Sequence, residues 1–194
     1  MKNIVIIGGT KGIGKAIVNS LVANNNITCL SRNKSDFSHD NYSHIKYNCL
    51  VDELPDIQFV DCLIYCPGSI NLRPITNLSI DDFRDDFEIN VIGAVKCIKK
   101  YLPQLKNGVN PSILLFSTVA TKLGMPYHAS VSVAKSGIDG LVKTLGAELS
   151  PKIRVNAIAP SLTDTPLASK LLLSLIHISE PTRQAEISYA VFCL

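Results

Sequence analysis

Short apolar runs alternate with longer segments of helical period along most of this chain. Apolar runs of four to six residues between turn residues are typical of fully buried parallel strands. They predict strands at residues 3–7, 27–31, 45–48, 61–66, 112–117 and 153–159, with helices between them at 12–23, about 79–102 and about 130–149. This order of elements indicates βαβ units, and therefore an α/β protein built on a doubly wound parallel sheet.

Local signals support two of the helix ends. Ser79, followed by Asp81 and Asp82, supplies an N-cap and first-turn acids at the start of the long helical stretch. The pair Ser150 and Pro151 ends the last helix, because proline disfavours helical backbone at the residue before it. No internal repeat or linker interrupts this pattern, so a single domain is expected.

The composition narrows the class of protein. With 194 residues, 46% of them hydrophobic, the chain is sized for one domain with a buried core, which argues against disorder. The balance of 19 Lys+Arg against 16 Asp+Glu gives a net charge of +3, too mild for nucleic-acid binding through phosphate neutralisation. The six cysteines lie mostly in apolar stretches and lack metal-site spacing, which fits a reducing compartment. Since neither a secretory signal core nor a bilayer-spanning stretch is found, we expect a cytoplasmic protein without a membrane partner.

A glycine-rich junction at residues 7–14 joins the first predicted strand to the first predicted helix. Glycines at such a junction let the backbone approach a phosphate, and the helix N-terminus offers free N–H groups to it. Two phosphate-binding motifs compete here. The spacing from Gly9 to Gly14 and Lys15 nearly matches a P-loop, but Ala16 stands where that motif needs Ser or Thr for magnesium.

The other spacing, Gly8-x3-Gly12-x-Gly14, resembles the short-chain dehydrogenase/reductase family, a variant of the Rossmann dinucleotide fold. Residues 61–68 are similar to the family's fourth strand and the turn after it, although of the usual Asn-Asn-Ala-Gly only Gly68 is kept.

Further segments follow in the family's order. Asn90 falls where the family has its active-site asparagine, and Lys135 matches the family lysine. Residues 154–160 closely resemble the sixth strand, and Thr163 and Thr165 match the segment that holds the nicotinamide carboxamide. The resemblance spans residues 1 to about 172 and implies an NAD(P)-binding Rossmann domain that acts on a small molecule. The cofactor-binding residues that it implies are Gly8, Thr10, Lys11, Gly12, Ile13, Gly14, Arg32, Gly68, Lys135, Thr163 and Thr165.

The charges near the second predicted strand indicate which cofactor is preferred. NAD-binding members place an Asp after this strand to hold the ribose hydroxyls, whereas a basic residue there accommodates a 2′-phosphate. This chain has Arg32 at that point and Lys11 inside the glycine turn. Guanidinium pairs well with phosphate, so we expect NADP(H) to be preferred over NAD(H).

The catalytic pattern is broken at one position. In the family a Ser, a Tyr and a Lys act together, with the Tyr phenol delivering a proton to the carbonyl oxygen. The family's tyrosine should be residue 131, which here is Val131, and its serine falls at Thr118, with Ser117 as an alternative if the register slips. Valine carries no titratable group, and losing a positioned general acid costs about 10²–10⁴ in rate.

Two nearby residues are candidates for the missing donor. Tyr127 and His128 lie just before the last predicted helix, in a loop that borders the substrate pocket in the family. An imidazole is a plausible proton donor near neutral pH. We therefore expect Asn90, Thr118, Lys135 and His128 as catalytic residues of a carbonyl/alcohol oxidoreductase. The alternatives are a catalytically silent NADP(H)-binding protein and, more remotely, a P-loop nucleotide-binding protein.

The end of the chain departs from the family. Residues 173–183 and 187–194 match the translation of a transposase-type sequencing adapter, with a short gap between them, so residues 173–194 are interpreted as a non-native tail. The family continues with further helices and a seventh strand, which commonly build a homo-oligomer interface. The Rossmann fold is therefore expected to be incomplete at its C-terminus. The edge of strand 153–159 is expected to be open and the chain poorly soluble.

Overall fold

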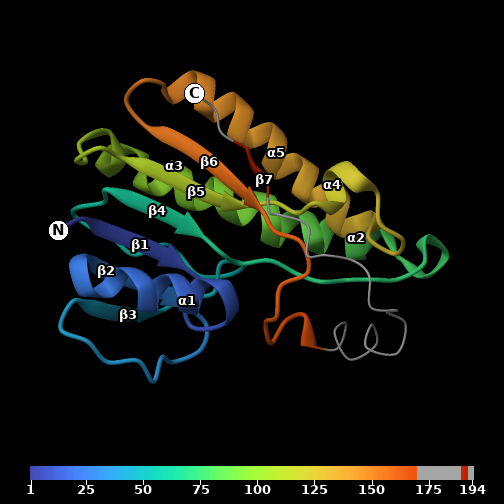
Figure 1. The fold of residues 1–194 in the computed structure, drawn as a ribbon, viewed down its shortest axis with the longest axis horizontal. Coiled ribbons are helices and arrows are strands. Elements are labelled where there is room, and N and C mark those ends of the chain that lie inside the picture. Colours follow the sequence, from blue (N-terminus) through green and yellow to red (C-terminus); the bar gives the residue numbers. More distant parts are fainter. Residues whose placement is uncertain (170–188, 192–194) are drawn as a thin grey trace.

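In the computed structural model, residues 1–169 and the backbone of residues 189–191 are described (Figure 1). Seven strands form one sheet in the order β3-β2-β1-β4-β5-β6-β7. The first six strands of the chain run parallel to one another, and β7 pairs antiparallel with β6. The strands are β1 (Asn3–Ile7), β2 (Asn26–Ser31), β3 (Tyr42–Lys46), β4 (Cys62–Tyr65), β5 (Ser112–Phe116), β6 (Arg154–Ala159) and β7 (Tyr189–Val191). The predicted doubly wound α/β fold is confirmed.

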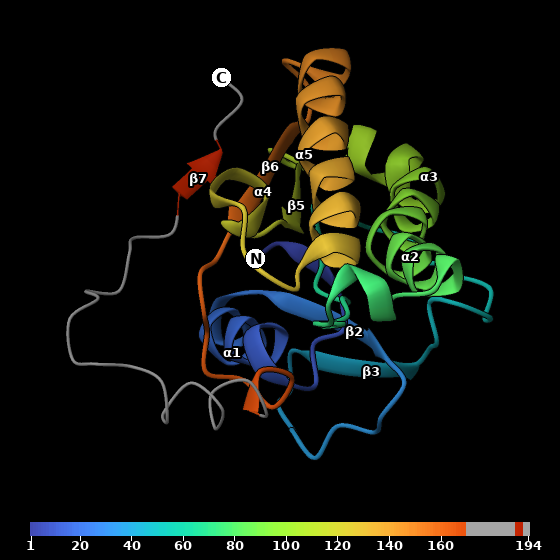
Figure 2. The same cartoon turned by 90° about the vertical axis from the view of Figure 1, so that its right-hand side faces the viewer.

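The helices cover both faces of this sheet (Figure 2). The chain order is α1 (Gly12–Leu21), the 3₁₀ turns η1 (Val22–Asn24) and η2 (Ile75–Asn77), α2 (Ile80–Phe87), the π-helical turn η3 (Glu88–Ile92), α3 (Gly93–Lys106), α4 (Ala120–Leu123) and α5 (Ala129–Leu149). None of the helices in the described part of the chain is long and apolar enough to cross a membrane.

Alternate residues of β1 enter two separate cores. Val5 and Ile7 pack in the cluster that also holds the buried residues of α3 and α5, whereas Ile4 and Ile6 pack with Val18 of α1. Because both faces of the strand are buried, its sequence is a continuous apolar run and not an alternating one. This explains why strands in the centre of the sheet were visible in the sequence.

Helix α2 begins at its predicted Ser79 cap, and α5 ends at Leu149, just before Ser150, as predicted. The long helical stretch differs from expectation. Ser79 accepts a hydrogen bond from the Asp82 N–H, and the Asp82 carboxylate accepts one from the Ser79 N–H, which completes a capping box. The stretch predicted at 79–102 is interrupted by η3 and continues past Pro103 to Lys106.

The third predicted strand is present, but its bounds are Tyr42–Lys46, so the predicted range 45–48 lay two to three residues too late. Its bounds are set by pairing with β2, which runs from Ile27 opposite Tyr42 to Ser31 opposite Lys46. The apolar signal lay further along because Ile45, Tyr47 and Cys49 pack into the core beneath α3. Tyr47 and Cys49 thus follow the strand instead of belonging to it.

The edge of β6 is not fully open, contrary to expectation. Residues 189–191, which belong to the adapter-like segment, pair antiparallel with residues 157–159. An edge strand presents unpaired backbone groups that accept another extended segment whatever its side chains. The rest of the predicted tail, residues 173–188 and 192–194, lies outside the described residues.

Candidate active site

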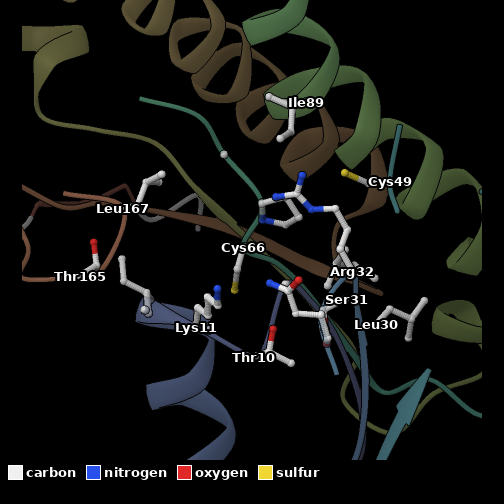
Figure 3. Close-up of a pocket in the computed structure, with 18 of the residues that line it drawn as sticks. Thr10, Lys11, Leu30, Ser31, Arg32, Cys49, Cys66, Ile89, Thr165 and Leu167 are labelled. Atoms are coloured by element: carbon white, nitrogen blue, oxygen red, sulfur yellow. The ribbon is translucent and has the colours of Figure 1, made fainter. Parts of the chain in front are cut away.

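A cleft of about 400 Å³ opens at the carboxyl ends of β1, β2 and β4. Thr165 and Leu167 lie on one side of it and Leu30 and Cys49 on the other, with Lys11 and Arg32 between them (Figure 3). In open α/β sheets, ligands bind at this edge because the strand order reverses between neighbouring strands there. The lining residues are Ile7, Gly8, Thr10, Lys11, Gly12, Ile13, Gly14, Leu30, Ser31, Arg32, Asn33, Tyr47, Cys49, Cys66, Pro67, Gly68, Ile89, Thr165, Pro166 and Leu167.

The glycine turn brings helix α1 against the end of β1. Gly8 and Gly12 adopt left-handed backbone with φ of 78° and 51°, which side chains rarely tolerate. Gly14 packs so closely that a Cβ there would clash with the Gly8 carbonyl oxygen. At the N-cap, Lys11 makes no side-chain capping bond, so the first N–H groups of α1 are free to bind an anion.

The charge of the cleft is entirely positive among the described lining residues. Lys11 and Arg32 are exposed cations, and no Asp or Glu stands beside them in the lining. A further contact supports the Arg32 loop. The Ser31 hydroxyl donates to the Asn33 carbonyl over 2.9 Å, and its oxygen lies 2.9 Å from His44 Nε2. Because the serine hydrogen is directed to Asn33, His44 is the donor in the second bond.

The structure brings most of the predicted cofactor-binding residues together. Nine of them line the cleft, namely Gly8, Thr10, Lys11, Gly12, Ile13, Gly14, Arg32, Gly68 and Thr165. Thr163 lies in an adjoining groove beside α1. A Cβ on Gly12 would contact the Thr165 side chain at 3.3 Å, so the segment after β6 closes over the glycine turn. Residues 1–169 contain no group of three His, Cys, Asp or Glu side chains placed to hold a metal ion.

Lys135 reaches from α5 to the end of β5. Its Nζ donates to the Phe116 carbonyl over 2.8 Å, and a Cβ on Gly68 would lie 3.5 Å from the same Nζ. Burial lowers the pKa of Lys135 to about 8, while Cys66, Asp139 and Asp86 act to raise it. The side chain is therefore partly held as an ammonium inside the protein, next to the cleft.

Asn90 lies in the π-helical turn, and the hydroxyl of Tyr65 hydrogen-bonds to the backbone of that turn. The Gly93 N–H bonds to the Glu88 carbonyl, one residue further back than in an α-helix, which frees the carbonyl of Ile89. The Tyr65 hydroxyl donates to this carbonyl over 2.6 Å. Gly93 is required beneath the ring, because a Cβ there would clash with the Tyr65 hydroxyl.

An apolar side chain stands at the position where the family resemblance predicts the tyrosine. Val131 is buried, one turn of α5 before Lys135, where it faces the same side of the helix. Thr118 is half-buried and accepts from the Ala120 N–H over 3.3 Å, which leaves its own hydrogen free to donate. The alternative, Ser117, is fully buried.

His128 and Tyr127 lie at the start of α5. His128 occupies the N-cap position, and its Nδ1 is 2.7 Å from the Pro126 carbonyl, so Nδ1 carries a hydrogen and Nε2 is the nitrogen available for other contacts. Tyr127 adopts a positive φ of 67° and is 60% exposed. His128 is three residues, about one helical turn, before Val131.

Some residues at the site were missed by the sequence reasoning. Tyr47 and Cys49 line the cleft because they follow β3. The rule that ligands bind at the carboxyl ends of parallel strands would have pointed to them. Ser69 and Asp86 hydrogen-bond each other beside Asn90, and no local sequence signal marks this pair.

The fold and the site together define a class of protein. A glycine turn, a free helix N-terminus and a cationic cleft at the strand-order reversal of a doubly wound sheet are the features of a dinucleotide-binding oxidoreductase domain. The family model described as enoyl-(acyl carrier protein) reductase matches residues 46–175. The chain belongs to the short-chain dehydrogenase/reductase family, as its sequence motifs indicated, and the P-loop alternative is wrong.

Individual relatives agree with this assignment. The chain is 27% identical over 217 residues to 2,5-dichloro-2,5-cyclohexadiene-1,4-diol dehydrogenase of Sphingobium indicum, covering 95% of this chain and 87% of the relative. It is 26% identical to 2-dehydro-3-deoxy-L-rhamnonate dehydrogenase (NAD(+)) of a Sphingomonas species, covering 86% and 74%. The solved structure of ElxO with NADP bound superposes with a TM-score of 0.78 at 25% identity, covering 90% and 79%. The protein is thus an oxidoreductase of the type that acts on alcohol or carbonyl groups of small molecules and binds an NAD(P) cofactor.

Replacing Gly14 with alanine should disrupt the cofactor site. The added methyl meets the Gly8 carbonyl and forces α1 away from β1, which we expect to weaken NAD(P)H binding about tenfold or more, by fluorescence titration. The matched control is Gly140→Ala in α5, where a Cβ meets nothing within 4 Å. It should leave binding unchanged and stabilise the fold by up to about 1 kcal/mol. Equal binding by both variants would contradict the role given to Gly14.

Proposed function

We propose that this protein is an NADP(H)-dependent oxidoreductase that interconverts a carbonyl compound and an alcohol. The observation that carries the cofactor preference is the lining of the cleft, where Lys11 and Arg32 are present and the described lining residues include no Asp or Glu. A carboxylate would favour the free ribose hydroxyls of NAD(H), whereas two cations favour a 2′-phosphate. As the family resemblance implies, we also propose a cytoplasmic homo-oligomer.

The residues of the chain fit this cofactor. The free N–H groups of Gly12, Ile13 and Gly14 would hold the pyrophosphate, and Arg32 with Lys11 would hold the 2′-phosphate. Lys135 would bind the nicotinamide ribose, and Thr163 and Thr165 the carboxamide, as in the family. When bound, NADPH supplies the hydride for carbonyl reduction.

On the substrate side, the chain offers donors but no phenol at position 131. The Thr118 hydroxyl would donate to the substrate oxygen and stabilise its developing charge. The positive charge of the Lys135 ammonium, with Asn90 beside it, would add to this stabilisation. The proton for the alkoxide would come from His128 through Nε2, because Nδ1 is held by the Pro126 carbonyl.

Val131 favours a second candidate function. A member of this family that binds NADP(H) without transferring hydride would have the same cofactor cleft and no need for a general acid. The two functions differ in turnover, while both require cofactor binding.

The first test measures NADPH oxidation by the protein with a panel of aldehydes and ketones, alongside NADPH binding by fluorescence. We expect turnover that falls by about 10²–10³ in Thr118→Ala, because one donor to the developing oxyanion is lost, and by about 10²–10⁴ in His128→Ala. Thr118→Ser retains the hydroxyl and should stay near the wild-type rate. Tight NADPH binding without turnover on the whole panel would overturn the enzyme and favour the silent binding protein.

Restoring the phenol gives a second test. In the His128→Ala background, Val131→Tyr should raise kcat by about 10²–10⁴, because a positioned acid then stands one turn before Lys135. Val131→Phe adds the same ring without the hydroxyl and should give no such gain. If both variants have the same kcat, the absence of a phenol at position 131 does not limit the reaction.

Cofactor preference is tested at Arg32. Arg32→Ser should weaken NADPH binding about tenfold to a hundredfold and leave NADH binding within about twofold, since only NADPH carries the 2′-phosphate. Arg84→Ser is the control, because Arg84 lies on α2 outside the cleft and pairs with Asp81. Equal loss of affinity for the two cofactors in Arg32→Ser would contradict the assignment.

A further inference from the structure

Three polar side chains form a hydrogen-bonded chain beneath the active site. Ser69 lies in the loop after β4, Asp86 on the last turn of α2 and Asn90 in the π-helical turn. Asp86 and Asn90 are 3% and 1% exposed, so a carboxylate is buried here although burial of a lone charge is strongly unfavourable. The short-chain oxidoreductase chemistry proposed above does not by itself require this carboxylate.

The donors in this chain can be assigned without ambiguity. Asn90 Nδ2 donates to the Asp86 carbonyl over 2.8 Å and to Ser69 Oγ over 3.1 Å. The one hydroxyl hydrogen of Ser69 goes to Asp86 Oδ1. Both amide hydrogens of Asn90 are therefore used, and its Oδ1 remains as a buried acceptor without a partner in the described structure.

This free acceptor lies next to Lys135. A Cβ built on Gly68 would be 3.1 Å from Asn90 Oδ1 and 3.5 Å from Lys135 Nζ, so both atoms border the same small space. Asp86 and Asp139 carry the negative charges that act on the Lys135 ammonium, and Cys66 also faces it. Asp86 Oδ2 and Asp139 Oδ1 have no hydrogen-bond partner among the described residues. Their charge is therefore available to the buried ammonium.

We propose that Asp86 is a positioning residue for the Lys135–Asn90 pair. Its carboxylate favours the charged form of Lys135, and its hydrogen bond from Ser69 turns the Asn90 carbonyl oxygen toward that ammonium. The helix supports this arrangement, because the π-helical turn places Asn90 one turn after Asp86. The catalytic consequence rests on the proposed function, whereas the effect on Lys135 itself does not need a cofactor or a substrate.

The charge of Asp86 is tested by following the protonation of Lys135 with NMR of labelled lysine side chains, assigned with Lys135→Arg. In Asp86→Asn the titration midpoint of Lys135, expected near 8 in the wild type, should fall, because one of the negative charges that raise it is lost. Asp85→Asn is the matched control, since Asp85 is the exposed neighbour on the same helix, and it should not move the midpoint. An unchanged midpoint in folded Asp86→Asn would overturn the proposal.

The hydrogen-bonded chain is tested separately at Ser69. In Ser69→Ala the side-chain amide protons of Asn90 should exchange with solvent about tenfold faster, because one of their two acceptors is lost, and Ser69→Thr should restore the slow exchange. Equal exchange in all three proteins would overturn the positioning of Asn90. This arm also decides the question if Asp86→Asn does not fold.

NADPH titrations on the same samples separate this inference from the proposed function. If Asp86→Asn shifts Lys135 but the wild type does not bind NADPH, the proposed function fails and the inference stands. If NADPH binds and Lys135 does not respond to Asp86→Asn, the inference fails and the cofactor assignment of the proposed function stands. Where both hold, the pH above which NADPH affinity declines should move down in Asp86→Asn together with the Lys135 midpoint.

Discussion

The parallel direction of the six main strands is the constraint on which the site depends. Parallel strands need crossover connections, so each of these six strands ends at the same edge of the sheet. Segments that are far apart in the sequence, from the glycine turn after β1 to Thr165 after β6, therefore meet around one cleft. The burial of both sheet faces by α1 on one side and by α3 and α5 on the other fixes these ends relative to one another.

A second constraint acts on the substrate side of this edge. The Tyr65 hydroxyl takes the carbonyl of Ile89 that a regular α-helix would use for its own hydrogen bond. Burial raises the pKa of Tyr65, so the phenol keeps the hydrogen that it donates. The extra residue in the turn displaces Asn90 from regular helical spacing and places it beside Ser69 and Lys135. Such π-helical turns are frequent at functional sites.

The two halves of the site differ in how closely they keep the family pattern. On the cofactor side, the glycine turn, the free helix N-terminus and the two cations are all in place. On the substrate side, the family resemblance puts buried Val131 at the position of the phenol, with Lys135, Asn90 and the Thr118 hydroxyl at the other predicted positions. Buried carboxylates on α2 and α5 supply negative charge around Lys135. In the proposed function, the protein therefore combines an ordinary nucleotide site with an altered proton-handling site.

The sequence by itself determined the order of strands and helices, the glycine turn, the Ser79 cap and the family, because these features are local or periodic. Arg32, Lys135 and Val131 were picked out in the same way, since each lies at a fixed distance from such a motif, and their roles stay predictions. Only the tertiary structure decided the bounds of β3, the π-helical turn, the Ser69–Asp86 contact and the pairing of β7 with β6. Each of these depends on a partner distant in the chain, such as β2 for β3 or Tyr65 for Ile89, and no window of sequence contains both members of the pair.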